Sequence, residues 1–238
     1  MTTGKPLDLR ARLLVAAFAA ALPVLLIAGS VRVISTTATL YDYGWWRYDI
    51  SGRTGLPADQ LDRVSLQFRD YFTNDAELLD LEVVAGGRTE TLLTEREVRH
   101  MRDVKVLIRN VFLAEWIAAA VVIGSILLGF AWLKSWFWRA LRAGTRYSAY
   151  GTLAAVAVIA VAAIVDFDGA FTLFHRISFR NDLWQLNPYE DYLLLLFPES
   201  FFFDATMAIA IMTTLEFAAV WLGTSWFERK FGAGRLAA

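Results

Sequence analysis

The sequence predicts a mainly α-helical integral membrane protein with four transmembrane helices and a small α+β insert between the first and second. The mean hydropathy of the 238-residue chain is +0.43 and 57% of its residues are hydrophobic, which is well above the soluble average. Four apolar runs reach the roughly 20 residues that a helix needs to cross a bilayer. These runs are Leu13–Ile34, Val111–Leu133, Tyr147–Val165 and Phe201–Phe227.

Lysine and arginine side chains predict the orientation of the chain. In the short segments they stand mostly before the first span, between the second and third spans, and after the fourth. The segment 37–110 holds ten more, but it exceeds the roughly 60 residues to which the rule of charge and orientation applies. Because positive charges collect on the cytoplasmic side, we expect 1–36 to hold a cytoplasmic N-terminus and the first span. We expect a cytoplasmic loop at 134–146, and the fourth span followed by a cytoplasmic C-terminus within 201–238. The insert at 37–110 and the segment 166–200 are then extracytoplasmic.

The insert carries the patterns of a small folded unit. A helical pattern begins at Pro57, and its apolar positions are Leu61, Val64, Phe68 and Phe72. Further on, Leu81–Val84 and Thr89–Leu93 flank the pair Gly86–Gly87, which predicts a β-hairpin.

Two segments are expected at the membrane surface. The insert opens with the aromatic residues Tyr41, Tyr43, Trp45 and Trp46. Tyrosine and tryptophan favour the headgroup level, since one edge is apolar and the other forms hydrogen bonds. Leu193–Phe197 is apolar but too short to cross a bilayer, so we expect it at the interface as well.

A second helix of the insert carries the first histidine. Thr94 and Glu97 form a capping box that starts this helix. His100 shares an apolar stripe with later positions, so it should face inward or toward the membrane. Asp103 is three residues further on and can reach His100. Lys105 lies off the stripe, where it could extend to lipid phosphates.

The polar residues around His175 form the densest candidate site. His175 lies in 171–203, between the third and fourth spans, and is one of only two histidines. Phe171–Phe179 has the pattern of an amphipathic interfacial helix or a re-entrant piece. Candidate binding residues beside it are Arg176, Arg180, Asn181, Asp182 and Trp184. The arginines could hold lipid phosphate or only anchor the interface, and the Asn–Asp pair could simply cap a turn.

Acidic residues in the apolar segments suggest a different function. Glu216 lies in the middle of the fourth span, Asp204 near its outer end, and Asp166 and Asp168 follow the third span. Intramembrane acids often mark ion paths, so a proton- or ion-coupled transporter or channel is an alternative. Because a charge at that depth is costly, we expect Glu216 to be protonated or paired inside the bundle.

Composition excludes several kinds of chemistry. The chain has no cysteine, so disulfides, thiolate metal sites and cysteine nucleophiles are excluded. The net charge of −1 suggests no nucleic-acid partner. Two histidines without a third ligand motif predict no metal site.

Several motifs resemble those of one protein family. They are His100-x-x-Asp103-Val104-Lys105, Asp166-Phe167-Asp168, Phe174-His175-x-Ile177-x-Phe179-x-Asn181-Asp182-x-Trp184, Pro188 with Asp191, and Phe197-Pro198-x-x-Phe201-Phe202. This set resembles bacterial four-span membrane proteins, long described as a domain of unknown function, that include the lipoprotein intramolecular transacylase. The resemblance runs from about Glu97 to Phe203, and the insert before it matches only loosely.

The resemblance implies an enzyme of the bacterial cytoplasmic membrane, with its active site on the extracytoplasmic face. Its partners would be membrane lipids and diacylglyceryl-cysteine lipoproteins, and it would need no cofactor. The sn-2 acyl chain would move from the glycerol to the α-amino group of the same cysteine, giving a lyso-form lipoprotein. A non-enzymatic membrane adaptor that binds a partner through the insert remains a third alternative.

Histidine chemistry suits such an acyl shift. The attacking amine has an ordinary pKa of about 7.7–8.0 and must lose a proton, which a histidine of pKa about 6.5 can accept. We expect His175 to be the general base, and His100 to be a second acid/base group or an oxyanion donor. Asp103 would fix the tautomer of His100. Each of these residues could instead have a purely structural role. His175 could be a histidine at the headgroup level, His100 could be packed in the protein, and Asp103 and Lys105 could form a surface pair.

Overall fold

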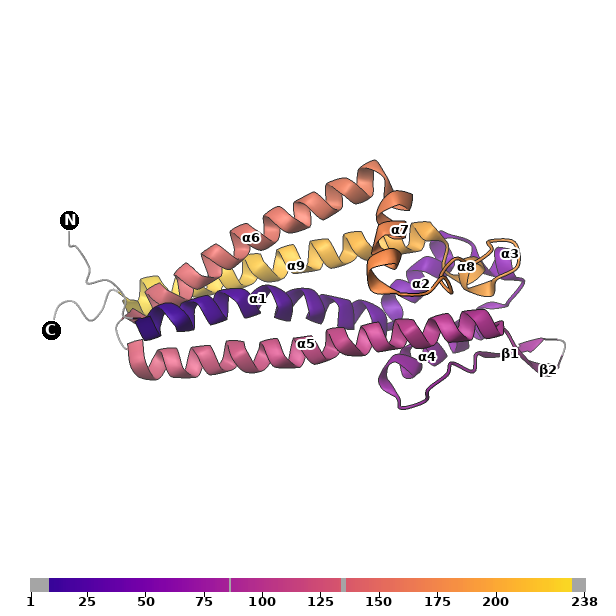
Figure 1. Cartoon of the computed structure of the whole chain (residues 1–238), viewed down its shortest axis with the longest axis horizontal. Helices are drawn as coiled ribbons and strands as arrows, with labels where there is room; N and C mark the ends of the chain where they lie inside the picture. Colours follow the sequence, from indigo (N-terminus) through magenta and orange to yellow (C-terminus); the bar gives the residue numbers. More distant parts are fainter. Residues whose placement is uncertain (1–8, 86, 134–135, 233–238) are drawn as a thin grey trace. The chain divides into compact units, whose positions relative to one another are not determined.

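A computed structural model describes residues 9–85, 87–133 and 136–232. The described chain is mostly helical (Figure 1). It divides into two compact units. We call them the bundle unit, Met1–Ser30, Leu113–Ile159 and Ala210–Ala238, and the hairpin unit, Val31–Phe112 and Ala160–Ile209.

Four long helices pass through the bundle unit. They are α1 (Leu9–Thr36), α5 (Glu95–Leu133), α6 (Phe137–Val165) and α9 (Glu199–Phe227), the last continuing into a π-helical turn, η2 (Glu228–Gly232). Within the described chain these four are long and apolar enough to cross a membrane. The prediction of four spanning helices is therefore confirmed.

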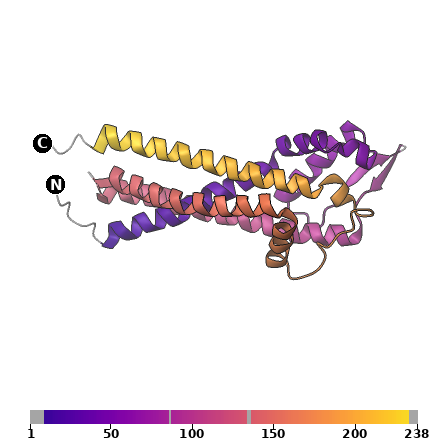
Figure 2. The same ribbon diagram turned by 90° about the horizontal axis from the view of Figure 1, so that it is seen from above.

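The helices of the bundle unit run alternately up and down. The starts of α1 and α6 lie at the same end as the ends of α5 and α9 (Figures 1 and 2). The described basic residues near this end are Arg10, Arg12, Arg139, Arg142, Arg146, Arg229 and Lys230. One of them, Arg142, forms an ion pair with Glu228.

The segment predicted as a loop at 134–146 is largely helical. Helix α6 begins at Phe137, so the loop's basic residues occupy the first turns of a helix, and residues 134–135 lie outside the described part. The reason is helix propensity: arginine, leucine and alanine, which fill this stretch, are strong helix formers regardless of charge.

The core of the bundle unit is formed by Phe18, Leu22, Val122, Ala149 and Phe217. Helix α6 comes close to α1 at Gly144, where an added Cβ would lie 2.9 Å from Phe18 Cδ1. In the same unit, the Ser30 hydroxyl donates to Glu216 Oε2 at 3.3 Å. The partner of Glu216, which was expected to be protonated or paired inside the bundle, is thus a neutral hydroxyl.

The hairpin unit combines short helices with one β-hairpin. Its own elements are α2 (Ala38–Arg47), α3 (Ile50–Thr54), α4 (Ala58–Thr73), β1 (Glu82–Ala85), β2 (Arg88–Thr91), α7 (Phe167–Ser178) and α8 (Tyr192–Leu196). Helix α4 starts directly after Pro57, as predicted, and its expected apolar positions are buried. The predicted hairpin also forms: β1 and β2 pair antiparallel, with Glu82 opposite Thr91 and Ala85 opposite Arg88.

Helix α4 supports the hairpin through side-chain amides. Gln67 accepts from the Glu82 amide at 2.9 Å and donates to the Glu82 carbonyl at 2.8 Å. Gln60 accepts from the Val84 amide at 2.9 Å. These bonds occupy backbone groups on the free edge of β1, which would otherwise be available to pair with another strand.

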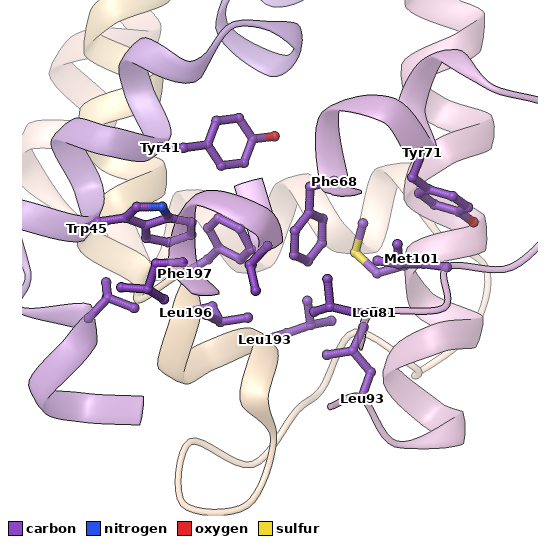
Figure 3. Close-up of a cluster of buried hydrophobic side chains, with 14 of the residues drawn as sticks. Tyr41, Trp45, Phe68, Tyr71, Leu81, Leu93, Met101, Leu193, Leu196 and Phe197 are labelled. Atoms are coloured by element: carbon purple, nitrogen blue, oxygen red, sulfur yellow. The ribbon is translucent and has the colours of Figure 1, made fainter. Parts of the chain in front are cut away.

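The hydrophobic core of the hairpin unit is centred on Phe197 (Figure 3). The Phe197 ring lies 4.9 Å from that of Phe68, 5.4 Å from Trp45 and 5.9 Å from Tyr41. Of the aromatic residues expected at the membrane surface, Tyr41 and Trp45 are core residues, whereas Tyr43 and Trp46 are exposed. Leu193 and Leu196 of α8, also expected at the interface, are buried in the same core. Apolar composition alone does not distinguish a protein core from a lipid surface.

The capping box at the start of α5 is present and extends further than predicted. Glu97 Oε2 accepts from the amide and hydroxyl of Thr94, at 2.7 and 2.8 Å. Its other oxygen accepts from the Leu193 amide at 2.7 Å. The Glu97 side chain, which is fully buried, therefore ties the start of α5 to the start of α8.

Candidate active site

The two histidines are neighbours within the hairpin unit. His100 lies on α5 and His175 on α7, and their ring centroids are 6.0 Å apart with the planes tilted by 36°. Each is buried, with 7% of its surface exposed. Residues 75 positions apart in sequence thus form one pair of titratable side chains.

Helix α7 fixes the His175 ring by a local bond. Asp166 caps the helix, its Oδ1 accepting from the Gly169 amide at 3.0 Å. His175 lies one turn before the end of this helix, and its Nδ1 is 2.8 Å from the Phe171 carbonyl oxygen. A carbonyl can only accept, so Nδ1 carries the proton and, in the neutral ring, Nε2 keeps its lone pair. His175 is therefore held in the tautomer that a general base at Nε2 requires.

Aromatic rings surround the pair. The rings of Phe171, Trp184 and Phe179 lie 4.2, 5.0 and 5.6 Å from that of His175. Phe179 also packs against His100, at 5.3 Å. Burial lowers the pKa of His175, and it lowers the pKa of His100 to about 4. Both imidazoles are consequently neutral at pH 7 and can accept a proton.

The expected hydrogen bond between Asp103 and His100 is not formed. Asp103 Oδ2 instead accepts from Asn181 Nδ2 at 2.8 Å. Nδ1 of His100 is buried and has no hydrogen-bond partner among the described residues. His100, the neighbour of Asp103 on the helix, was therefore the wrong partner to expect. The actual partner, Asn181, lies 78 positions after Asp103 in the sequence. A buried unpaired nitrogen is costly, and a bound group could satisfy it.

The expected role of Lys105 at lipid phosphates does not fit its position. The residue is 4% exposed. Its Nζ donates to Asn74 Oδ1 at 2.9 Å and to the Ala76 carbonyl at 2.6 Å, and it lies 4.1 Å from the centre of the Tyr71 ring. Lys105 therefore holds the turn after α4 against α5, inside the protein.

The other candidate binding residues lie at the end of α7 and in the segment that follows it. Arg176 and Arg180 are exposed, and neither has a hydrogen bond or ion pair within the part of the chain that the structure describes. Asn181 and Asp182 belong to a tight turn, where Asn181 Oδ1 accepts from the Leu183 amide. Trp184, half-buried, packs against His175 with the ring planes tilted by 31°.

Sequence reasoning missed one residue close to this turn. Arg96, one helical turn before His100, donates through Nη2 to the Asp182 carbonyl at 2.7 Å and through Nε to the Leu183 carbonyl at 3.4 Å. Its place on the same stripe of α5, four residues before His100, was the available signal. Nothing in the sequence indicated which segment it would contact.

The arrangement defines a class of protein: a multi-pass membrane protein with a buried pair of neutral histidines suited to acid–base chemistry. Within residues 9–85, 87–133 and 136–232, no three metal-ligating side chains come together. Comparison with known proteins identifies the family. The model of the family "Lipoprotein intramolecular transacylase Lit" matches residues 16–202, and the chain belongs to this family.

Solved structures of that family share the fold. The membrane-integral lipoprotein intramolecular transacylase Lit from Bacillus cereus superposes with a TM-score of 0.78 at 17% identity, covering 93% of this chain and 97% of that one. A Bacillus cereus variant with one histidine replaced by arginine gives a TM-score of 0.74 at 17% identity, covering 93% of each chain.

A relative without assigned function is also similar. An uncharacterized protein of Aquifex aeolicus is 27% identical over 145 residues. This match spans 60% of the chain and 60% of the relative's length.

Proposed function

We propose that this protein is an intramolecular transacylase of lipid-modified proteins. The observation that carries the proposal is the buried pair of His100 and His175, 6.0 Å apart, in a chain of this family. The sn-2 acyl group of a diacylglyceryl-cysteine moves to the α-amino group of the same cysteine. One amide bond forms, one ester bond breaks, and the product is a lyso-form lipoprotein.

The first step is attack of the neutral α-amine on the ester carbonyl carbon. His175 Nε2 accepts the proton that the attacking nitrogen must lose, because the Phe171 carbonyl already holds the Nδ1 proton. Burial keeps the imidazole neutral and available for this task. Amine and ester belong to one molecule, so their correct placement supplies much of the lowering of the barrier.

The second step is collapse of the tetrahedral intermediate. The carbon–oxygen bond to the glycerol breaks, and the leaving alkoxide takes the proton from His175. No proton has to come from water. His100, whose Nδ1 lacks a partner within the described chain, is placed to hydrogen-bond the oxyanion or the glycerol oxygen.

The outer face of α7 suits a lipid substrate. Leu173 and Ile177 are 58% and 77% exposed, and Phe174 is half-exposed while its edge contacts the His175 ring. Arg176 and Arg180 are exposed near this apolar face and can pair with phosphate groups of lipids. Acyl chains packed along α7 would bring an ester close to His175.

We propose that the hairpin unit is extracytoplasmic. The described arginines and lysines of the bundle unit lie toward the end where α1 and α6 start, and the segment 37–110 exceeds the roughly 60 residues within which basic residues determine orientation. The chain has no cysteine, so single cysteines can report the orientation. An impermeant thiol reagent added to whole bacteria should label position 55 or 187 and spare position 143. Labelling at 143 alone would invert this assignment.

The activity is tested in a bacterium that lacks other N-acylating enzymes. Mass spectrometry of a lipoprotein's N-terminal peptide should show unchanged total acyl mass, with one chain that survives mild alkali as an amide. Arg99→Ala, which removes only an exposed ion pair with Glu95, is the matched control and should leave conversion intact. A free α-amine despite wild-type protein in the membrane would refute the function. Conversion by His175→Ala would refute the mechanism.

A further inference from the structure

One stripe of α5 is covered by the turn that follows α7. Arg96, His100 and Asp103 are spaced four and three residues apart, so they lie on one face of the helix. Asn181 is bonded to Asp103, and the carbonyls of Asp182 and Leu183 to Arg96. The turn therefore runs in the opposite direction to α5 and is attached to it on both sides of His100, over roughly 10 Å of helix.

The turn has its own internal hydrogen bonds. Asn181 Oδ1 accepts from the Leu183 amide at 3.1 Å, and the backbone and side chain of Asp182 both accept from Gln185. The Trp184 carbonyl accepts from the Leu186 amide at 2.9 Å. A turn bonded in this way moves as one piece, so two attachments to α5 are enough to fix the position of Trp184.

We propose that Arg96, Asp103 and Asn181 are positioning residues that hold residues 181–184 on α5 and thereby keep Trp184 against His175. We call these attachments the clamp. The proposal rests on the transacylase function for its kinetic consequences, although the position of Trp184 can be measured without it. In this arrangement the clamp excludes water from the two imidazoles and preserves their orientation.

The clamp assigns Asp103 a role different from that of a carboxylate that orients a histidine. Asp103 acts as an acceptor for Asn181, and an amide oxygen can accept the same bond. Asp103→Asn should therefore keep the turn in place, whereas Asp103→Ala should release it. If Asp103 acted on His100 through its charge, the two substitutions would be equally damaging.

A swap of the two partners tests the bond itself. Asn181→Asp places two carboxylates against each other, and the double variant Asp103→Asn with Asn181→Asp restores one donor and one acceptor. We expect Asp103→Ala, Asn181→Ala, Arg96→Ala and Asn181→Asp each to lower kcat about tenfold, as for loss of a bond to a charged group. Asp103→Asn and the double variant should stay within about threefold of wild type.

A spectroscopic measurement separates this inference from the function. The chain has two histidines, so protein carrying labelled histidine and a histidine-free tag gives two imidazole signal sets in nuclear magnetic resonance. In Asn181→Ala, which retains the Asp103 charge, water should reach the rings and the pKa values of both should rise toward about 6.5. Arg99→Ala should leave both titrations unchanged.

The titrations and the rates distinguish the clamp from a charge effect of Asp103 on His100. Shifted titrations in Asn181→Ala with recovery in the double variant support the clamp, even if wild-type protein shows no acyl transfer and the proposed function fails. Unshifted titrations in both Asn181→Ala and Arg96→Ala overturn the clamp, even if the enzyme is active. Equal loss of kcat in Asp103→Asn and Asp103→Ala also overturns it, in favour of a charge effect on His100.

Discussion

Burial of the His100 ring predicts how the stability of the protein depends on pH. The pKa of this side chain is lowered to about 4, chiefly because burial disfavours the charged ring, with a smaller effect of His175. In the unfolded chain it should titrate near 6.5. Between these two values the unfolded state binds more protons than the folded state. The free energy of unfolding therefore falls as the pH falls.

The size of this effect follows from the two pKa values. With 6.5 in the unfolded chain and about 4 in the folded one, acidification from about pH 7.5 to about pH 4.5 removes about 2.5 kcal/mol. The contribution of His100 is complete above about pH 6.5 and is lost progressively as the pH approaches about 4. Domains are stable by only about 5–15 kcal/mol, so the change is large enough to measure.

His100→Phe provides the comparison, because it removes the titrating group and keeps an aromatic ring beside Phe179. Equilibrium unfolding of both proteins in detergent micelles, followed by tryptophan fluorescence at the two pH values, gives four free energies. Every other group titrates in both proteins, so the difference between the two pH effects isolates His100. His100→Gln is a second variant in case the larger ring packs poorly. If acidification lowered the free energy of unfolding equally in the wild type and in both variants, the reasoning would be refuted.

Two buried charged residues should affect stability rather than catalysis. Lys105→Met leaves the Ala76 carbonyl without its charged donor and should lower the free energy of unfolding by about 2 kcal/mol, with turnover per folded molecule retained. The exposed Arg102→Met is the control, and a raised KM at normal stability would instead favour substrate binding by Lys105. Glu97→Gln replaces an acceptor facing Leu193 or Thr94 by a donor and should cost about 2–3 kcal/mol, measured by the same unfolding assay. Unchanged stability would show that the buried carboxylate is not a structural tie.

Local patterns predicted most of the secondary structure. The four apolar runs, the helix after Pro57, the glycine-centred hairpin and the Thr94–Glu97 cap depend on neighbours in sequence, and all are present. Boundaries were less accurate, as at Phe137, where helix propensity extended α6 into the predicted loop. Patterns of this kind report the period and the ends of an element but not what it packs against.

Burial was the harder property to predict. Tyr41, Trp45 and Leu196 have the composition of a membrane surface, and all three lie in the protein core. Lys105 has the flexible stem of a residue that reaches outward, yet its ammonium group is enclosed. A core and a lipid phase present the same apolar environment, so hydropathy cannot tell them apart.

The candidate site was also only partly predictable, because its contacts join segments that are far apart in the sequence. The two histidines were singled out individually and assigned to one reaction, but nothing in the sequence indicated that their rings would be neighbours. The partner of Asp103 was assigned to the nearest residue on the helix, while the structure provides Asn181 from a distant turn. Arg96 was missed because its partners are backbone carbonyls, which no side-chain motif marks.

The bond between His175 and the Phe171 carbonyl also bears on how long a proton can remain on this ring. A carboxylate partner would stabilise an imidazolium by charge, whereas a neutral carbonyl within a shell of phenyl and indole groups offers far less compensation. A proton received at Nε2 is therefore held at high free energy and has a strong tendency to leave. For a rearrangement that releases a proton at one atom and needs it at another on the same molecule, such a carrier favours rapid transfer over storage. The resting and final states of the ring are then identical, and each turnover leaves it ready for the next.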